Sequence, residues 1–228
     1  MTKAAKITVT ANGPYVVDGN LPLSYQHIVV NEAGESLDWR AGKDVPHGES
    51  YSLCRCGKSL KKPFCDGSHT RLRFDGTETA SHAPYEKQAE RTEGPTMVLE
   101  DTEKLCAFAR FCDPHGQVWN LVGRSDDPRA AALVEQEAGH CPSGRLVAKR
   151  QAHPQAFEPK FAPSIGLIQD TAQGVSGALW ARGGIPVVSA TGYAYEVRNR
   201  VTLCRCGASR NKPFCDGSHA SVRFTDQH

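Results

Sequence analysis

The sequence has few aromatic side chains, no strong excess of one charge and no long apolar run. Phe, Trp and Tyr make up 7% of the 228 residues, so the aromatic contribution to a core is small. Lys and Arg number 27 against 25 Asp and Glu, and this balance gives no basic surface for nucleic acid. No segment approaches the roughly 18 apolar residues of a membrane span. Residues Met1–Thr8 also lack the apolar stretch of a secretory signal, so we expect a cytoplasmic protein.

Nine cysteines distinguish this sequence from that of an ordinary globular chain. An odd number of cysteines cannot pair completely in disulfides within one chain. Thiols stay reduced in the cytoplasm, where clustered cysteines are typical of metal ligands. Six of the nine lie in two matching groups, which disfavours an interpretation as scattered buried thiols. We therefore expect metal sites and not disulfide bridges.

An internal repeat contains both cysteine groups. Residues 52–69 have the sequence SLCRCGKSLKKPFCDGSH and residues 202–219 have TLCRCGASRNKPFCDGSH, with 14 of the 18 positions identical. A weaker similarity upstream relates Gly13–Leu23 to Gly177–Val187, with a glycine turn in each. The first copy is 14 residues longer between its glycine turn and its cysteines. We interpret the extra residues, around Asn31–Gly48, as a loop insertion.

Short β-branched segments predict strands in both copies. They are Ile7–Thr10, Pro14–Val17, Gln26–Val30, Leu179–Ala181, Pro186–Val188, Tyr193–Val197 and Val201–Leu203. Because each copy alone has too few strands to bury a core, we expect the two copies to pack together and share a sheet. A strand near 14–18 or 179–182 should cross from one copy to the other.

The middle of the chain differs in character from both copies. Asp127 and Pro128 open a predicted helix that continues to Ala138, with Asp127 as its N-cap. A second short helix is expected over about 102–111. Polar residues before this unit and proline-containing residues after it are interpreted as linkers. The predicted domains are a first repeat over 1–80, a middle segment over 96–160 and a second repeat over 175–228.

Each copy of the repeat contains the pattern C-x-C-x8-C-x3-H. Three thiolates and one imidazole suit either zinc or an iron–sulfur cluster. Zinc sites commonly use a C-x2–4-C spacing, so a C-x-C pair fits less comfortably around one ion. Such a pair can instead bind one iron of a two-iron cluster, and the spacing alone leaves both alternatives open. The candidate ligands are Cys54, Cys56, Cys65 and His69 in the first copy and Cys204, Cys206, Cys215 and His219 in the second.

The block C-x-C-x2-S-x3-P-x-C-D-G-S-H, present twice in full, resembles the cluster-binding motif of the CDGSH iron–sulfur family, the mitoNEET-like proteins. This resemblance covers about residues 10–75 and 177–225. It implies that each set of three cysteines and one histidine holds one [2Fe-2S] cluster. It also implies a strand-swapped β-rich dimer, which tandem members build within one polypeptide. We therefore expect a β-rich α+β fold whose repeats form an intramolecular pseudo-twofold β-cap with two cluster lobes.

Other residues of the repeated motif are candidates for supporting a cluster. The serines are expected to donate hydrogen bonds to sulfur, the aspartates to cap a short helix that leads to the histidine, and the glycines to let the backbone approach sulfide. Ordinary turn chemistry is the alternative for the serines and aspartates. These residues are Ser59, Asp66, Gly67 and Ser68, with Ser209, Asp216, Gly217 and Ser218. Arg55 and Arg205 are expected to tune an anionic cluster or to meet an acidic partner, with ordinary solvation as the alternative.

Cys106, Cys112 and Cys141 form a third set. Ala109 stands where a ferredoxin ligand run has its second cysteine, and Pro142 follows the last cysteine. The remaining pattern, C-x5-C…C-P, resembles that of divergent single-cluster ferredoxins. This resemblance implies a small ferredoxin-like α+β insert between the repeats.

The resemblance of the third set implies a [3Fe-4S] cluster, or a [4Fe-4S] cluster with an outside ligand such as His115 or Asp113. A degenerate unit without a cluster is the alternative. In either case the predicted helix over 127–138 should return Cys141 to the segment that contains the other two cysteines. We therefore expect the three sulfur atoms to converge.

Together these patterns predict an iron–sulfur protein that acts in one-electron transfer or in cluster transfer. Its partner would be a redox protein or an apo-iron–sulfur acceptor, with no nucleic acid or membrane involved. A zinc-stapled interaction module without redox function is the alternative. The sequence contains no nucleophile–base arrangement, phosphate loop or dinucleotide fingerprint, so we do not expect an enzyme. A monomer with internal pseudo-twofold symmetry is the expected state.

Overall fold

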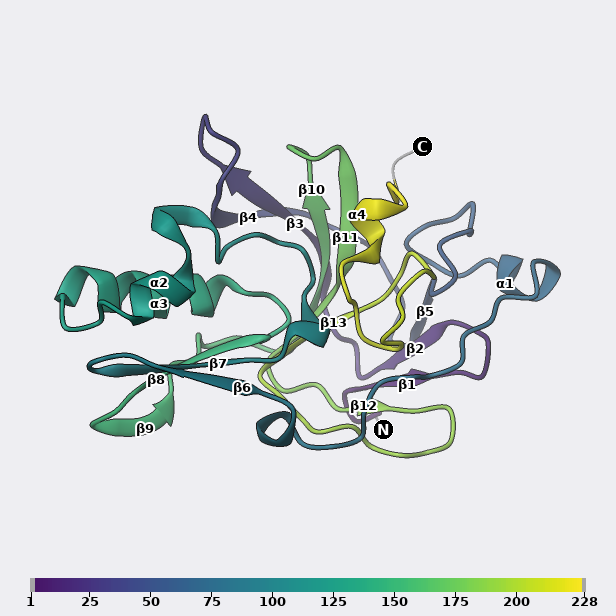
Figure 1. Ribbon diagram of the computed structural model, residues 1–228. Coiled ribbons are helices and arrows are strands. Elements are labelled where there is room, and N and C mark those ends of the chain that lie inside the picture. Colours follow the sequence, from purple (N-terminus) through teal and green to yellow (C-terminus); the bar gives the residue numbers. More distant parts are fainter. Residues whose placement is uncertain (1–2, 227–228) are drawn as a thin grey trace.

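The computed structural model describes residues 3–226 and contains three β-sheets with a few short helices (Figure 1). The strands are β1 (Lys6–Val9), β2 (Tyr15–Asp18), β3 (Leu23–Val30), β4 (Ser36–Asp44), β5 (Tyr51–Leu53), β6 (Glu90–Glu93), β7 (Met97–Asp101), β8 (Leu146–Arg150), β9 (His153–Ala156), β10 (Ser164–Asp170), β11 (Val175–Arg182), β12 (Val187–Val188) and β13 (Arg200–Leu203). The α-helices are α1 (Ser68–Arg71), α2 (Val118–Val122), α3 (Pro128–His140) and α4 (Ser218–Ser221). Within residues 3–226, none of the helices has the length and apolarity that a bilayer crossing requires.

Two of the sheets contain strands from both repeats. One sheet has the order β12-β1-β2-β5, and the other has the order β13-β11-β10-β3-β4. The first repeat's β1 pairs in parallel with β12 of the second, and its β3 pairs in parallel with β10. Each repeat therefore adds a strand to the sheet of the other, and the prediction that the copies share a sheet is confirmed.

The strands that cross between the repeats are β3 and β12, so the expectation of a crossing strand near 14–18 or 179–182 is wrong. β2 pairs with β1 and β5, and β11 pairs with β10 and β13. The exchange comes one strand later because a glycine in left-handed conformation redirects the chain after each of these strands. Gly19 has a φ of 90° and Gly183 a φ of 78°.

The two shared sheets enclose one hydrophobic core that both repeats build. Along β2, Tyr15 and Val17 are buried and Val16 between them is more exposed, so every second side chain points inward. Ile165 and Leu179 of the second sheet belong to the same cluster of buried side chains. Burial of one such side chain contributes about 1.5–3 kcal/mol. Separation of the repeats would expose both halves of this core.

The insertion in the first repeat is a strand and not the predicted loop. β4 pairs with β3 and forms the edge of the second sheet. Its Trp39 lies against Trp180, with ring centroids 4.5 Å apart, and against Phe111 of the middle segment at 4.8 Å. The Trp39 Nε1 group also donates to the carbonyl oxygen of His140 at 3.0 Å. The insertion thus attaches the middle segment to the second repeat.

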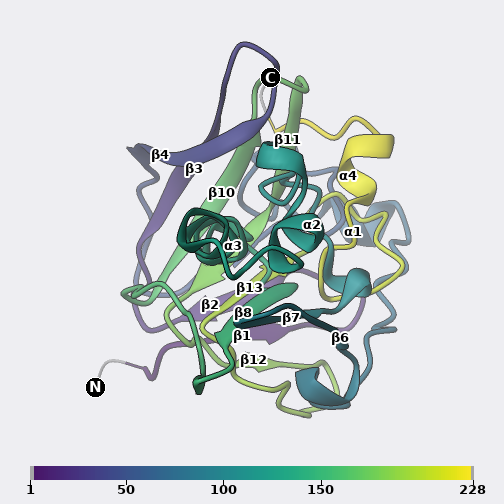
Figure 2. The same ribbon diagram turned by 60° about the vertical axis from the view of Figure 1, so that its left-hand side comes forward.

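The middle segment forms the third sheet, β6-β7-β8-β9, which packs against α2 and α3 (Figure 2). The α3 helix confirms the predicted one, because the Asp127 side chain accepts the Arg129 amide and Pro128 occupies the first turn. The helix expected over 102–111 is wrong: only Glu103–Leu105 forms a 3-10 turn. Phe108 and Arg110 have left-handed φ values of 53° and 61°, which a helix does not tolerate.

Other elements also differ from the sequence predictions. The residues interpreted as linkers contain β6 before the middle segment, and β9 and β10 after it. The strand predicted over Tyr193–Val197 is absent from the described residues, where Ala194 forms a single bridge with Val188. Between the two bridged residues the chain turns at Gly192, which has a φ of 87°.

Candidate metal centres

The two C-x-C loops occupy matching positions at the ends of β5 and β13. The Sγ atoms of Cys54 and Cys56 lie 3.7 Å apart, and those of Cys204 and Cys206 also lie 3.7 Å apart. All four thiols are free and buried. Each loop thus presents two adjacent sulfur atoms on the same side of a short turn.

The remaining two candidate ligands of each copy form a second pair. Cys65 Sγ lies 3.3 Å from His69 Nδ1, and Cys215 Sγ lies 3.5 Å from His219 Nδ1. The short helices α1 and α4 place each histidine one turn after its cysteine. Within residues 3–226, no group of three or more His, Cys, Asp or Glu side chains has the arrangement for holding one metal ion. The donors therefore lie as two pairs in each copy.

Asp66 and Asp216 connect the turn before the histidine to the loop before the third cysteine. Asp66 accepts from the amides of Ser68 at 3.0 Å and Leu60 at 2.9 Å. Asp216 accepts from the corresponding amides of Ser218 and Arg210. The Leu60 amide, followed by Ser68, lowers the pKa of Asp66 well below its usual range. The hydrogen bonds of the two aspartates to the first amide of each short helix were predicted. Their hydrogen bonds to the loop before the third cysteine were not.

Backbone amides around the first cysteine of each C-x-C pair favour its thiolate form. The hydrogen bond with Cys56 lowers the pKa of Cys54, and the amides of Ser59, Gly57 and Lys58 lower it further while burial opposes them. The second copy repeats this pattern, with Cys206 and nearby amides lowering the pKa of Cys204. The same thiol–thiol hydrogen bonds raise the pKa of Cys56 and of Cys206, so in each pair one sulfur is favoured as thiolate and the other as thiol.

Three of the motif serines donate to protein oxygen atoms within the loops. The Ser59 hydroxyl donates to the carbonyl of Phe64 at 2.6 Å, and Ser209 donates to Phe214 at 2.7 Å. The Ser218 hydroxyl donates to Asp216. Each of these three hydroxyls has a carbonyl or carboxylate acceptor, and donation by the motif serines to cluster sulfur stays a prediction. It is the amides of Gly67 and Gly217 that point to sulfur, at 3.5 Å from Cys65 and 3.4 Å from Cys215.

Arg55 and Arg205 are buried and brace the fold, so the expectation that they face a partner or solvent is wrong. Arg55 donates to three carbonyls, those of Gly13, Gly76 and Thr10. Arg205 donates to Gly177 and Ile168 and forms a buried ion pair with Asp226. Each guanidinium therefore joins a ligand loop to the strand that begins its repeat.

The two C-x-C loops lie directly against each other. A Cβ atom at Gly57 would lie 2.5 Å from the carbonyl oxygen of Cys206, and one at Gly207 would lie 2.7 Å from that of Cys56. Tyr15 of the first repeat is fully buried and donates to the carbonyl of Cys204 at 2.7 Å. The sequence analysis missed Tyr15, since its partner lies 189 residues away.

The third cysteine set converges as predicted. Cys106, Cys112 and Cys141 line one cavity together with backbone of residues 107–111. Burial raises the pKa of Cys112, and the charges of Asp113 and Cys141 add to this effect. The two outside ligand candidates differ in their contacts. Asp113 lies 3.7 Å from Cys112 Sγ, whereas the His115 Nδ1 atom lies 3.0 Å from Glu137.

Arg200 joins this third set to the second repeat, and the sequence analysis missed it too. Its buried guanidinium donates to the carbonyls of Cys141 at 2.8 Å and Ala138 at 2.9 Å, and pairs with Glu158. Arg200 is the first residue of β13, and Cys204 directly follows the last residue of that strand. No sequence pattern marks such a contact, because an isolated arginine in a strand resembles a solvated one.

Comparisons with known proteins agree with these three sites. The family model described as "Iron-binding zinc finger CDGSH type" matches residues 12–70 and 176–220, and the model described as "Divergent 4Fe-4S mono-cluster" matches residues 92–151. The human "CDGSH iron-sulfur domain-containing protein 3, mitochondrial" is 46% identical over 39 residues. This match covers 14% of the chain and 31% of the length of that relative.

The chain is therefore of the iron–sulfur class. More particularly, it carries two CDGSH-type iron-binding regions with a divergent iron–sulfur mono-cluster region between them. Both resemblances inferred from the sequence are confirmed.

Proposed function

We propose that the chain holds two [2Fe-2S] clusters through its two Cys3His sites and acts in one-electron transfer or cluster transfer. The observation that carries this proposal is the pairing of the ligands in each copy. A metal bound to two thiolates at about 2.3 Å in a tetrahedron places the two sulfur atoms about 3.8 Å apart. The 3.7 Å separations of Cys54 from Cys56 and of Cys204 from Cys206 match this edge.

The Cys–His pairs would bind the second iron of each cluster. Their separations of 3.3 and 3.5 Å suit one tetrahedral metal with a shorter bond to nitrogen. A single zinc ion, the alternative, needs all four donors around one point, and their arrangement as two pairs favours two irons. A bound cluster would supply one-electron chemistry, and one histidine in place of a thiolate raises its reduction potential.

The strand pairings support an internal pseudo-twofold relation between the repeats. β1, β2 and β5 of one sheet correspond in order to β10, β11 and β13 of the other, and the crossing strands β12 and β3 occupy equivalent positions. We propose that this arrangement is the β-cap, with the two ligand loops meeting near the axis. The partner would be a redox protein or an apo-acceptor, and the chain would not itself be an enzyme.

The third set is proposed to hold a [3Fe-4S] cluster, or a [4Fe-4S] cluster with Asp113 as the outside ligand. Support comes from the convergence of three cysteines on one cavity and from the contact of Asp113 with Cys112. His115 is less suited, because Glu137 already occupies its Nδ1 atom.

Iron, sulfide and zinc counts on anaerobically purified protein test these proposals. Two loaded repeats give about four irons per chain, and a third cluster raises the count to about seven or eight. Replacement of Cys65 by Ser should remove about two irons, and Cys112→Ser should change only the third signal in electron paramagnetic resonance. A colourless protein with two zinc ions would overturn the proposal.

A further inference from the structure

We infer that the two repeated sites are unequal: the middle segment closes the second site, and the matching face of the first repeat is a docking surface for an acidic protein. We define the first-site face as the exposed residues Lys58, Leu60, Lys61, Arg71 and Leu72, with Gly67 and His69 between them. The closure is a property of the chain itself. Its measurable effect on iron release rests on the proposed function.

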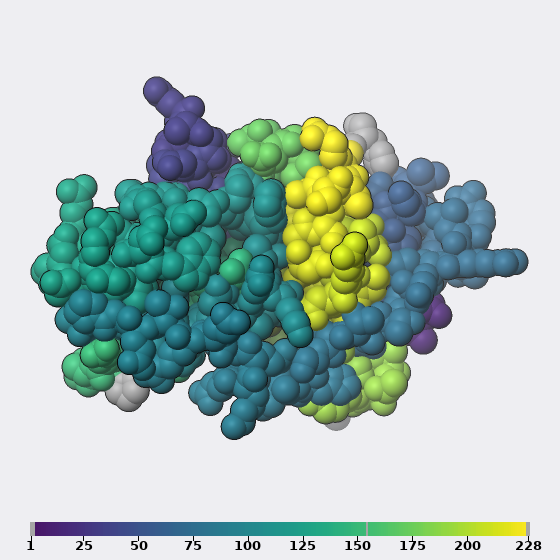
Figure 3. Space-filling view, viewed as in Figure 1, coloured from purple at the N-terminus to yellow at the C-terminus, as the bar shows by residue number. Residues whose placement is uncertain are grey.

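Residues 104–110 cover the second site. A Cβ atom at Gly217 would lie 3.2 Å from both the Cys106 carbonyl oxygen and Phe108 Cβ. Ala107 packs in one buried cluster with Cys215. In the space-filling view the second repeat's lobe, in yellow, lies between the teal middle segment and the blue first repeat (Figure 3). Its His219 is accordingly 3% exposed.

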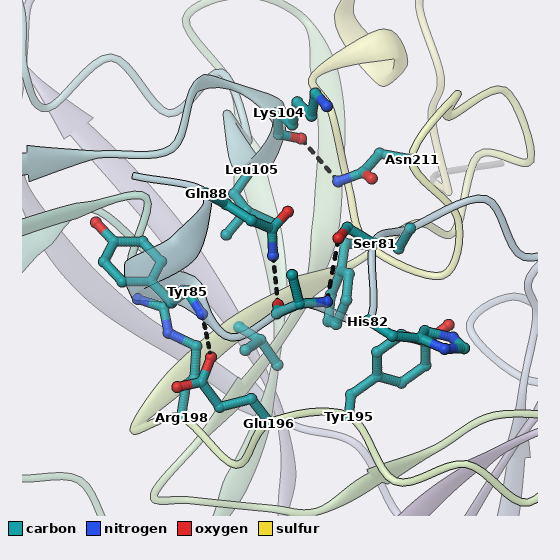
Figure 4. A pocket seen from close by; sticks show the side chains of 14 residues that line it. Ser81, His82, Tyr85, Gln88, Lys104, Leu105, Tyr195, Glu196, Arg198 and Asn211 are labelled. Carbon is teal, nitrogen blue, oxygen red and sulfur yellow. Dashed lines mark hydrogen bonds between the residues drawn. The ribbon is translucent and has the colours of Figure 1, made fainter. Parts of the chain in front are cut away.

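Two polar contacts hold this cover in place. The Asn211 side-chain amide donates to the Lys104 carbonyl at 2.9 Å, as Figure 4 shows beside a cavity lined by the inter-repeat residues Ser81, His82 and Tyr85. On the other side, Arg110 forms a two-pronged ion pair with the buried Asp170, at 2.5 and 3.2 Å. The cover is therefore fixed at both ends to the second repeat.

The equivalent face of the first repeat carries no such cover among the described residues. A Cβ atom at Gly67 would meet nothing within 4 Å, in contrast to Gly217. His69 is only partly buried. Leu60 and Leu72 beside it are 72% and 51% exposed, so this face has an apolar component open to solvent.

The side chains that surround this open face differ between the repeats in a consistent way. Lys58, Lys61 and Arg71 of the first repeat correspond to uncharged residues in the second, and Leu60 corresponds to an arginine. The corresponding residues are Ala208, Asn211, Ser221 and Arg210. The open face thus has three basic side chains and the exposed Leu60 where the second repeat has uncharged residues and Arg210, whereas Leu72 is matched by the similarly exposed Val222.

The covered face shows which partner the open one suits. In the second repeat this face seats a protein segment through a backbone contact and apolar packing. The corresponding face of the first repeat exposes Leu60 and Leu72 together with the basic Lys58, Lys61 and Arg71. Charge complementarity selects a protein whose acidic residues surround an apolar patch.

Binding of a defined acidic protein tests the docking surface. The probe is the apo form of an acidic [2Fe-2S] ferredoxin, titrated against the full chain at about 0.05 and 0.3 M salt, since screening weakens charge pairing. Lys58→Glu/Lys61→Glu should weaken binding about tenfold or more. The matched control Arg210→Glu/Arg223→Glu alters exposed residues of the second repeat and should change it less than about twofold. Salt-insensitive or absent binding, or equal loss in both variants, would overturn the docking surface.

Iron release to a chelator tests the closure. The wild-type chain should lose iron from its two repeated sites in two phases that differ about tenfold or more in rate, because the second site must first open locally. Phe108→Ala/Asn211→Ala should accelerate the slow phase only, and His69→Cys should alter the fast phase only. A single phase, or acceleration of the fast phase by the cover variant, would overturn the closure. Zinc in place of iron would instead contradict the proposed function and leave the binding experiment valid.

Discussion

Two glycines set how closely the ligand loops of the repeats approach each other. Gly57 and Gly207 have left-handed φ values of 73° and 82°, and each faces the carbonyl of a ligand cysteine from the other repeat. Any side chain there would strain the backbone and also push the two loops apart. Glycine at both positions therefore lets the two C-x-C loops pack directly against each other.

Gly57→Ala is expected to lower the free energy of unfolding by about 3 kcal/mol, because a Cβ atom would lie 2.5 Å from the Cys206 carbonyl oxygen. Gly67→Ala is the matched control. Gly67 also has a left-handed φ, of 84°, but has nothing within 4 Å of its Cβ position, so only about 1 kcal/mol is expected. Denaturant unfolding of both variants measures the difference. Equal losses would show that close packing of the loops contributes nothing.

The buried ligand His219 predicts how the second site responds to acid. Burial, followed by the charge of Arg205, lowers the pKa of His219 to about 4, below its ordinary value of 6.5. The unfolded chain therefore takes up the proton first, and stability that is complete above pH 6.5 is lost as pH falls toward 4. His219→Cys replaces the proposed imidazole ligand with a thiolate and should slow the loss of cluster absorbance between these pH values. Identical decay in wild type and variant would contradict a protonatable histidine at this site.

At the scale of single elements, helix α3 has a buried carboxyl group, for which the charged form is unfavourable. Glu137 of this helix is buried, and burial raises its pKa from 4.5 to about 7, although the hydrogen bond with His115 opposes the change. The folded protein holds this proton more tightly than the unfolded chain does. Its stabilising effect is complete below pH 4.5 and is lost as pH rises through 7.

Glu137→Gln should therefore raise the free energy of unfolding by about 1 kcal/mol at pH 8 and leave it nearly unchanged at pH 4.5. Glu135→Gln on the same helix is the control, because Glu135 forms a more exposed pair with Arg150 at 2.6 Å. Urea unfolding at the two pH values gives both comparisons. A gain at pH 4.5 equal to that at pH 8 would show that the carboxyl charge is not the cause.

The role of β4 in holding the middle segment can be tested at Trp39. Trp39→Ala removes the ring contacts with Trp180 and Phe111 and the hydrogen bond to His140, and should cost about 3 kcal/mol. The neighbouring Arg40 is exposed, so Arg40→Ala should change stability by less than about 0.5 kcal/mol. Hydrogen exchange at the end of α3 should increase in the tryptophan variant alone. Unchanged exchange there would show that Trp39 does not hold the middle segment in place.

The elements that the sequence predicted well are those whose signal is local. The repeated motif identified the two CDGSH-type regions, and Asp127-Pro128 identified the start of α3. β4 was taken for a loop because it is an edge strand with mostly exposed residues, in which the short alternation of Leu37, Trp39 and Ala41 ends at Gly42 and two charged residues. The contacts of Tyr15, Arg55 and Arg200 arise between distant segments, so no local pattern of residues encodes them.

At the scale of the whole molecule, the exchange of β3 and β12 satisfies within one chain the pairing that otherwise requires two. We expect light scattering to give the mass of one chain, 24.8 kDa, at micromolar concentration. The reason is that each shared sheet already has its strand from the other repeat. An obligate dimer would contradict this account of the fold.

The exchanged strands also set the order in which the chain can become structured during synthesis. β1 must wait for β12, about 180 residues later, and β3 must wait for β10. The middle segment, whose strands pair with near neighbours, has no such delay. Contacts between distant residues form slowly, so the middle segment can fold while the first repeat still waits on the ribosome. We therefore expect the first repeat's C-x-C loop, whose Gly57 packs against Cys206, to reach its final geometry only after the second repeat has been made.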